Sequence, residues 1–380
     1  MTDAEILCDI RQHVAIITLN RPAALNALSL GMLVELRARL RRCAEDSDVH
    51  AVLLRGAGDK AFCAGGDIRA LYRSFKESGS LHRAFFVAEY TLDYLLYSYP
   101  KPYVVLLDGI AMGGGMGLAQ GSTLRIAGER TRMAMPEVSI GLFPDVGASY
   151  FLSRLRGSLG TYLALTGVQL HGADAVYAGL ADVYLAPAAI AALPDDLAAL
   201  DWPDDRGAWH EVVRRLLDGR SLAPERIPAS PGQTSLSMLQ PAIDAHFSHS
   251  SVSAVLDSLD GENRADLAPW GRRTAALIRS RSPTLLSVTL QQLARGKSLD
   301  LAGCFRMELG MVQQCFEQGD FIEGVRALLI DKDNAPHWAP ARLEDVTEES
   351  VRAFFQNRWG GAQHPLDNIE SESLTAGDRS

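Results

Sequence analysis

Residues 109–147 bring together the residue types in this chain that could do chemistry: a run of three glycines and two acidic side chains. The glycines at 113–115 follow an apolar run, so their backbone can approach a ligand closely or adopt a positive φ, and a helix is expected after them. Exposed amides at such a place bind anions. Glu137 and Asp145 stand next to prolines and glycines that fix their positions, among apolar residues that would desolvate a carboxylate. Amides beside desolvated carboxylates indicate acyl chemistry.

The composition excludes several classes of protein. With 380 residues, 47% hydrophobic and 22% charged, the chain is expected to fold as one large domain or two smaller ones. A formal net charge of −9 and a pI near 5.5 disfavour nucleic acid and anionic membranes as partners. The five cysteines show no CxxC spacing, which favours reduced thiols, and the sequence shows neither a membrane-spanning apolar run nor a basic leader. We therefore expect a cytoplasmic protein without a membrane partner.

The first two hundred residues alternate strand-like and helix-like segments. Residues 14–19 are apolar and rich in β-branched side chains, which predicts a strand, and Ser29 is expected to cap the following helix. Residues 51–54 are uniformly apolar, which predicts a strand buried on both faces. This alternation indicates an α/β fold. Further strands are predicted at 103–107, 124–126 and 133–135, and helices at 68–75, 81–97, 149–155 and 161–165.

A change of composition divides the chain near residue 200. Three prolines and five aspartates interrupt the periodicity at 186–205, and only helical patterns follow. The sequence therefore predicts an α/β core at 1–200 with the active site and a helical region at 201–360. Residues 361–380 contain few apolar side chains and are predicted to form a flexible tail.

Two glycine turns together resemble the crotonase (enoyl-CoA hydratase/isomerase) superfamily. The segment 62–67, Phe-Cys-Ala-Gly-Gly-Asp, and the glycines 113–115 match its two loops, over roughly residues 10–190. The resemblance implies a crotonase-like spiral of β-β-α units and an acyl-CoA thioester whose carbonyl is bound by the amides of Gly66 and Gly114. It also implies that residues near the first loop contact substrate, namely Ala64, Asp67 and Ile68. No cofactor is expected, since CoA is part of the substrate, and a homo-oligomer such as a trimer is implied.

The acidic residues limit which reaction of the superfamily the chain could catalyse. Hydratases of the superfamily carry a glutamate two residues after the triple glycine, where this chain has Gly117, and a second in the later Pro-Glu pair, which here is Glu137. The chain therefore lacks one of the two acids that catalyse the addition of water to a double bond. The string 135–147, MPEVSIGLFPDVG, and the segment 320–338 resemble the 3-hydroxyisobutyryl-CoA hydrolases, over about residues 8–345. This resemblance implies hydrolysis of a short 3-hydroxyacyl-CoA and a place in valine catabolism.

The roles of the acids follow from the same resemblance. Glu137 would activate water or attack the thioester itself, and Asp145 would hold the 3-hydroxyl or the water. Glu89, on the predicted helix 81–97, would shape the acyl pocket. Candidate cations for the CoA phosphates flank the two loops: Arg21, Lys60, Arg69 and Arg73.

Two other functions stay open at this stage. An enoyl-CoA isomerase or hydratase with rearranged acids is one, because a single glutamate can shuttle a proton. A crotonase-fold scaffold or RNA-binding protein is the other, although the net charge of −9 disfavours RNA. The sequence shows no phosphate-binding loop of the form GxxxxGK[ST], no HExxH and no GxSxG, which disfavours nucleotide hydrolysis, zinc proteolysis and serine esterase chemistry.

Overall fold

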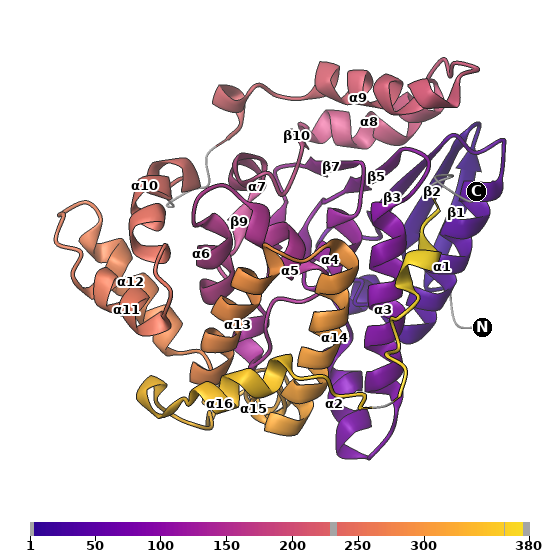
Figure 1. Cartoon of the computed structure of the whole chain (residues 1–380). Coiled ribbons are helices and arrows are strands. Elements are labelled where there is room, and N and C mark those ends of the chain that lie inside the picture. The colour runs from indigo at the N-terminus through magenta and orange to yellow at the C-terminus, as the bar shows by residue number, and fades with distance from the viewer. Residues whose placement is uncertain (1–3, 229–233, 361, 375–380) are drawn as a thin grey trace.

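A six-stranded sheet forms the centre of the protein in a computed structural model that describes residues 4–228, 234–360 and 362–374 (Figure 1). Its strand order is β1-β2-β3-β5-β7-β10; β1 is antiparallel to β2, and the other pairs are parallel. Alternate side chains of one strand enter two different cores, as Leu53 and Leu54 of β3 do, so both faces of the sheet are covered. The strands are β1 (Ile6–Arg11), β2 (Val14–Leu19), β3 (Ala51–Gly56), β5 (Tyr103–Leu106), β7 (Leu124–Ala127) and β10 (Val183–Tyr184).

A second, four-stranded sheet completes a repeating unit. Its order is β4 (Ala61–Cys63), β6 (Ile110–Met112), β8 (Arg132–Ala134) and β9 (Leu170–His171). Each unit consists of a strand of the first sheet, a strand of the second and a helical segment: β3-β4-α2, β5-β6-α4 and β7-β8 with the 3-10 turn Glu137–Ile140. The predicted spiral of β-β-α units is therefore confirmed. The helices of this half are α1 (Leu30–Glu45), α2 (Ile68–Lys76), α3 (Leu81–Tyr97), α4 (Gly114–Gln120), α5 (Ala148–Phe151), α6 (Leu159–Thr166), α7 (Gly172–Ala178) and α8 (Pro187–Ala198).

The segment 186–205, where the sequence predicts an interruption, is largely the helix α8. Pro187 stands in its first turn, where no backbone donor is lost, and Pro194 lies within it. Leu193 and Leu197 of α8 pack with Val213 of α9 (Trp209–Arg220) against the outer face of the sheet. Figure 1 shows α8 and α9 side by side along the top of the molecule. The change of composition therefore marks a helix pair that covers the sheet.

The helical half shares its main core with the α/β half. Phe305 of α14 contacts Tyr90 of α3, with ring centroids 5.6 Å apart, and both belong to one buried cluster. In the described part of the chain no strand follows β10, and no helix is long and apolar enough to cross a membrane. The helices are α10 (Leu236–Phe247), α11 (Val252–Asp260), α12 (Ala268–Arg279), α13 (Pro283–Gly296), α14 (Leu301–Gln318), α15 (Asp320–Val325) and α16 (Glu348–Arg352).

The prediction of a flexible tail is wrong for residues 362–374. Leu366 and Ile369 are only 2% and 3% exposed, and Glu372 accepts hydrogen bonds from Arg37 and Arg41 of α1. Figure 1 shows this yellow segment running along α3 to α1. Two buried apolar anchors and charge pairing hold a segment whose composition alone predicts no packing. Residue 361 and residues 375–380 of the predicted tail lie outside the described part.

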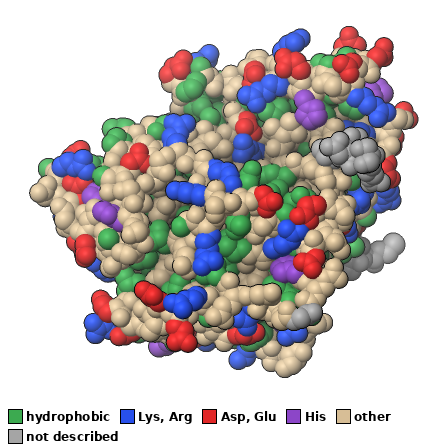
Figure 2. Space-filling model, viewed as in Figure 1, with side chains coloured by type: hydrophobic (Ala, Val, Ile, Leu, Met, Phe, Trp, Pro, Cys, Tyr) green, Lys and Arg blue, Asp and Glu red, His purple; other side chains and the backbone are tan. Residues whose placement is uncertain are grey.

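On the face shown in Figure 2, basic and acidic side chains are interspersed.

Candidate active site

The two glycine turns meet. A Cβ built at Gly65 would lie 3.2 Å from the amide nitrogen of Gly114 and 3.5 Å from Cα of Gly113. Gly65 has φ of +95° and Gly113 has φ of +50°, values that favour glycine. The loop after β4 and the start of α4 are therefore brought together as the sequence predicts.

The amides of Gly66 and Gly114 are directed away from the backbone ladders. Gly66 forms a single parallel bridge with Leu28, in which the Leu28 amide donates to Gly65 O at 2.8 Å and the Asp67 amide donates to Leu28 O at 3.0 Å. In a parallel bridge of this kind the amide of the central residue points to the other side. Gly114 is the first residue of α4, so its amide has no acceptor within the helix. Each amide is therefore free of the backbone ladders and can donate to a ligand; that both bind one oxygen stays a prediction.

Glu137 and Glu89 border these amides. A Cβ at Gly113 would lie 3.1 Å from Oε1 of Glu137, and a Cβ at Gly114 would collide with Oε1 of Glu89. Glu89 is 2% exposed and Glu137 is 6% exposed. One oxygen of each, Oε1 of Glu89 and Oε2 of Glu137, has no hydrogen-bond partner among the described residues. Buried carboxyl oxygens without protein partners are suited to bind a substrate or water.

Asp145 is held by a tight turn. Its Oδ2 accepts a hydrogen bond of 2.7 Å from the hydroxyl of Tyr90, the residue after Glu89 on α3. Glu308 of α14 accepts hydrogen bonds from the amides of Gly147 and Ser149, at 2.7 and 2.8 Å. Gln292 of α13 donates to the carbonyl of Pro144 at 2.6 Å. The helical half therefore fixes the turn that presents Asp145.

Burial governs the charges of these acids. It is the main cause that raises the pKa of Glu137 and that of Glu89 well above the ordinary value, and the charge of Asp145 raises both further. Burial also raises the pKa of Asp145, but the hydrogen bond from Tyr90 opposes it and leaves the value at about 6. Of these three acids, Asp145 is therefore the one that ionises most readily.

Sequence reasoning missed two buried acids. Asp93 lies one turn after Glu89 on α3, is fully buried, and has no partner for either oxygen among the described residues. Its Oδ2 would lie 2.5 Å from a Cβ at Gly117, so its carboxyl borders the position where hydratases carry their glutamate. Glu308 is fully buried, and burial raises its pKa to about 8. The i, i+4 spacing of two acids in an apolar helix was the signal for Asp93.

The residues predicted near the first loop differ in their contacts. Ala64 donates its amide to Leu25 O at 3.0 Å, and the side chain of Ile68 would lie 3.9 Å from a Cβ at Gly66. Asp67 caps α2 by accepting from Ala70, and its carboxylate pairs with Arg21 at 3.2 Å. Asp67 therefore has structural contacts, while its predicted contact with substrate stays a prediction. Among the described residues, no group of three or more His, Cys, Asp or Glu could hold a metal ion.

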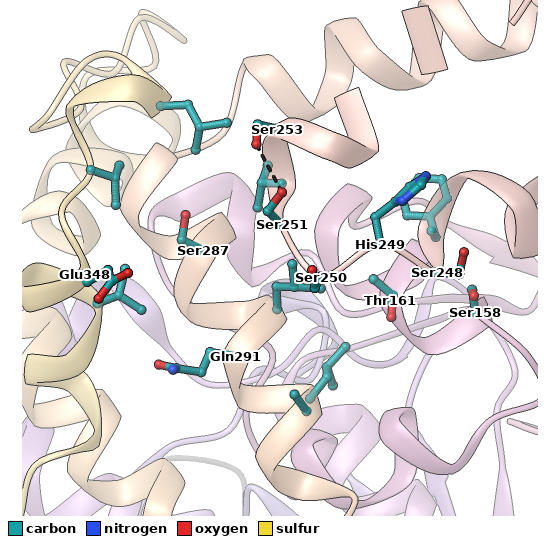
Figure 3. A pocket seen from close by; sticks show the side chains of 18 of the residues that line it. Ser158, Thr161, Ser248, His249, Ser250, Ser251, Ser253, Ser287, Gln291 and Glu348 are labelled. Atoms are coloured by element: carbon teal, nitrogen blue, oxygen red, sulfur yellow. Dashed lines mark hydrogen bonds between the residues drawn. The ribbon is translucent and has the colours of Figure 1, made fainter. Parts of the chain in front are cut away.

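A groove of about 1000 Å³ lies elsewhere, on the helical half. The loop between α10 and α11, helix α13 and helix α16 line it, and Figure 3 shows hydroxyl groups around it. Ser251 and Ser253 are joined by a hydrogen bond of 3.1 Å there, with Ser287 and Gln291 of α13 nearby (Figure 3). Its lining includes none of the predicted site residues, all of which lie in the described part. The groove is therefore separate from the acids and the glycine turns.

The chain is similar to several known proteins. A family model described as Enoyl-CoA hydratase/isomerase matches residues 14–355. The 3-hydroxyisobutyryl-CoA hydrolase, mitochondrial, of Rattus norvegicus is 41% identical over 357 residues, which cover 93% of this chain and 89% of that protein. The protein of the same name from Homo sapiens is 39% identical over 364 residues, 94% of this chain and 90% of that protein. The solved structure of a carnitinyl-CoA dehydratase from Mycobacterium thermoresistibile has a TM-score of 0.81 and 39% identity, and covers 93% of this chain and 97% of that chain.

The spiral of β-β-α units and the two adjoining glycine turns define a protein of the crotonase fold. Buried carboxyls beside those turns are the second part of that definition. The chain belongs to the enoyl-CoA hydratase/isomerase family and, within it, to the family of 3-hydroxyisobutyryl-CoA hydrolases. The resemblance drawn from the motifs of the sequence is therefore confirmed.

Proposed function

We propose that the protein hydrolyses 3-hydroxyisobutyryl-CoA, a short 3-hydroxyacyl-CoA thioester, to the free acid and CoA. The observation that carries the proposal is the contact between Glu137 and the glycine turn, with Oε1 of Glu137 3.1 Å from a Cβ built at Gly113. A carboxylate at this place faces a carbonyl held by the amides of Gly66 and Gly114. The relatives named above as 3-hydroxyisobutyryl-CoA hydrolases support the choice of substrate.

The amides stabilise the charge that forms during attack. The thioester oxygen becomes negative as water adds to the carbonyl carbon, and each preorganised donor of this kind contributes about 10²–10³ in rate. Glu137 takes the proton of the water, the C–S bond breaks, and Glu137 returns this proton to the leaving thiolate of CoA. Burial makes Glu137 a stronger base by raising its pKa well above the ordinary value. Direct attack by Glu137, followed by hydrolysis of the mixed anhydride, would use the same groups.

Asp145 and Glu89 fit two different tasks. Asp145, with a pKa of about 6, is ionised at neutral pH and can accept a hydrogen bond from the substrate 3-hydroxyl or from the attacking water. Glu89 borders the amide of Gly114, and burial raises its pKa well above the ordinary value. Its burial beside Gly114 suits Glu89 to shape the acyl pocket.

A second candidate function is hydration of an enoyl-CoA. It is favoured by the carboxyl of Asp93, which borders position 117 and could serve as the second acid. The similar solved structure titled carnitinyl-CoA dehydratase points in the same direction. The hydrogen-bonded Asp145 turn and the two hydrolase relatives favour hydrolysis instead.

Glu137→Gln tests the proposal. Thiol release from 3-hydroxyisobutyryl-CoA is expected to fall by about 10²–10⁴, because the amide cannot act as base or nucleophile, while CoA binding by calorimetry is retained. Parallel assays with crotonyl-CoA follow the loss of enoyl absorbance. Thiol release by the wild-type protein only from the first substrate supports the hydrolase, and loss of absorbance with the second supports the hydratase. An active Glu137→Gln variant would contradict the role of this residue.

We propose further that the reaction needs no cofactor beyond the CoA of the substrate, and that the protein acts in valine catabolism. A homo-oligomer, such as a trimer, in the cytoplasm, with no nucleic acid or membrane as partner, completes the proposal. Thiol release after dialysis against a chelator tests the first point, and light scattering measures the oligomer. The relatives named above are called mitochondrial, so cell fractionation tests the compartment.

A further inference from the structure

The guanidinium of Arg21 joins three segments. Its Nη1 donates to the carbonyl of Ala27 at 2.7 Å, its Nη2 pairs with Oδ2 of Asp67 at 3.2 Å, and its Nε pairs with Oε1 of Glu5 at 3.0 Å. Its side chain is 22% exposed. Each of the three nitrogens therefore has an acceptor within the protein. A guanidinium has five N–H donors, so these contacts leave two of them, and the expectation that Arg21 binds a CoA phosphate stays a prediction.

Two of these contacts lie on either side of the bridge that orients Gly66. Ala27 precedes Leu28, whose amide and carbonyl bind Gly65 O and the Asp67 amide at 2.8 and 3.0 Å. Asp67 follows Gly66 directly. Arg21 therefore links the residue before Leu28 to the residue after Gly66, and so holds the two bridged segments together.

The loop that carries Arg21 is itself fixed from within the fold. Asn26, 1% exposed and with φ of +56°, accepts the Arg21 amide at 2.9 Å and donates to the carbonyl of Ala61 in β4 at 2.8 Å. On the other side, Glu5 accepts from Ser29, the cap of α1, at 2.8 Å. A charged side chain with rigid partners on both sides can transmit that rigidity to the Gly66 loop.

We infer that Arg21 is a positioning residue for the oxyanion amide of Gly66, acting through Asp67 and Ala27. The inference rests on the proposed hydrolysis of an acyl-CoA. The bridge at Gly66 lies outside the named strands, so no strand ladder continues it on either side and its geometry depends on contacts such as those of Arg21. Without Arg21 the Asp67 carboxylate and the Ala27 carbonyl lose a donor, and the Gly66 amide turns away from the carbonyl oxygen.

Two substrates separate positioning from phosphate binding. Thiol release is measured with 3-hydroxyisobutyryl-CoA and with 3-hydroxyisobutyryl-pantetheine, which lacks the nucleotide phosphates. Arg21→Ala is expected to lower kcat by about tenfold to a hundredfold, by the same factor with both substrates, because a small misplacement of a catalytic group has an effect of this size. The ratio of the two KM values is expected to stay at the wild-type value.

Three further variants test whether the loss of kcat comes from the ion pair between Arg21 and Asp67. Asp67→Asn keeps an oxygen to cap α2 but removes the ion pair, and is expected to reproduce most of the loss of kcat. Arg21→Lys keeps the charge and is expected to recover part of the activity. Arg11→Ala removes an arginine that pairs with Asp9 and Asp195 at the surface, with a side chain 45% exposed, and is expected to match the wild-type protein.

The outcomes are distinct. A loss confined to the CoA substrate, or no loss at all, overturns the positioning role. Wild-type protein that releases thiol from neither substrate overturns the proposed hydrolase function. Hydrogen exchange of a peptide spanning 62–68 then still tests Arg21, since faster exchange in Arg21→Ala supports the positioning role and unchanged exchange contradicts it.

Discussion

Tyr90→Phe removes the hydroxyl that donates to Asp145 at 2.7 Å and leaves the ring in place. This hydrogen bond opposes burial and holds the pKa of Asp145 at about 6. A hydrogen bond to a charged group contributes about 1.5–3 kcal/mol. At 1.36 kcal/mol for each unit of pKa, its loss would raise the pKa of Asp145 by about one to two, to about 7–8.

The sign of the effect on activity follows from the charge that Asp145 must carry. If the ionised form is the active one, activity appears as pH rises through the pKa of Asp145, so the variant is active only at higher pH. At pH 7 the ionised fraction of Asp145 would fall from about nine tenths to between one tenth and one half. At pH 9 the variant would approach the wild-type rate, since Asp145 is ionised there.

The assay is thiol release from 3-hydroxyisobutyryl-CoA between pH 5.5 and 9.5, with kcat/KM plotted against pH. The acidic limb of the profile is expected near pH 6 for the wild-type protein and about one to two units higher for Tyr90→Phe. Tyr94→Phe, one turn further along α3, is the matched control and should keep the wild-type profile. An unshifted limb, or an equal loss at every pH, would refute the reasoning that Tyr90 sets the charge of Asp145.

Two further predictions concern the buried acids. Gly114→Ala places a Cβ against Oε1 of Glu89 and is expected to lower kcat by about 10²–10³. Gly219→Ala in α9, where nothing lies within 4 Å of the added Cβ, is the control and should match the wild-type protein. An active Gly114→Ala variant would contradict the role assigned to the Gly114 amide. Burial raises the pKa of Glu308 from 4.5 to about 8, so the folded protein binds more protons than the unfolded chain in this window, and this group lowers the free energy of unfolding as pH rises through it. Glu308→Gln cannot titrate, so urea unfolding at pH 6, 7.5 and 9 should show a smaller loss of stability with pH than in the wild-type protein, and equal slopes would contradict the prediction.

Much of the fold follows from local patterns. The strand β2 spans the predicted residues 14–19, and the helix α3 spans the predicted 81–97, because apolar periodicity and short breakers define both. The strand β1 was not predicted, since only Ile6 among its residues is fully buried and its polar side chains face solvent at the sheet edge. The turns at Gly65 and Gly113 could be placed because their positive φ values call for glycine.

The remainder depends on contacts between distant segments. Glu308 lies 161 positions after Gly147, whose amide donates to its carboxyl group. Nothing near Glu308 in the sequence shows that it binds the turn that carries Asp145. The contacts of Arg21 with Glu5, Asp67 and Ala27 could not be predicted, because charge alone does not show which acceptors a folded loop supplies. The packing of the segment 362–374 could not be predicted for the same reason. Two apolar residues, Leu366 and Ile369, anchor it because the rest of the fold supplies a surface that buries them.

The ion pair between Arg37 and Glu372 closes a loop of 335 positions. Contacts between residues so far apart cost more loop-closure entropy than local ones, so we expect this pair to form after the helices between its residues. The same contacts lie at an edge of the structure and depend on few buried groups, so they open at low free-energy cost while the sheet stays intact. The segment 362–374 packs on α3, whose Phe86, Tyr90 and Leu92 belong to the main core, so its opening would uncover one side of α3 while the buried side with Glu89 and Asp93 stays in place.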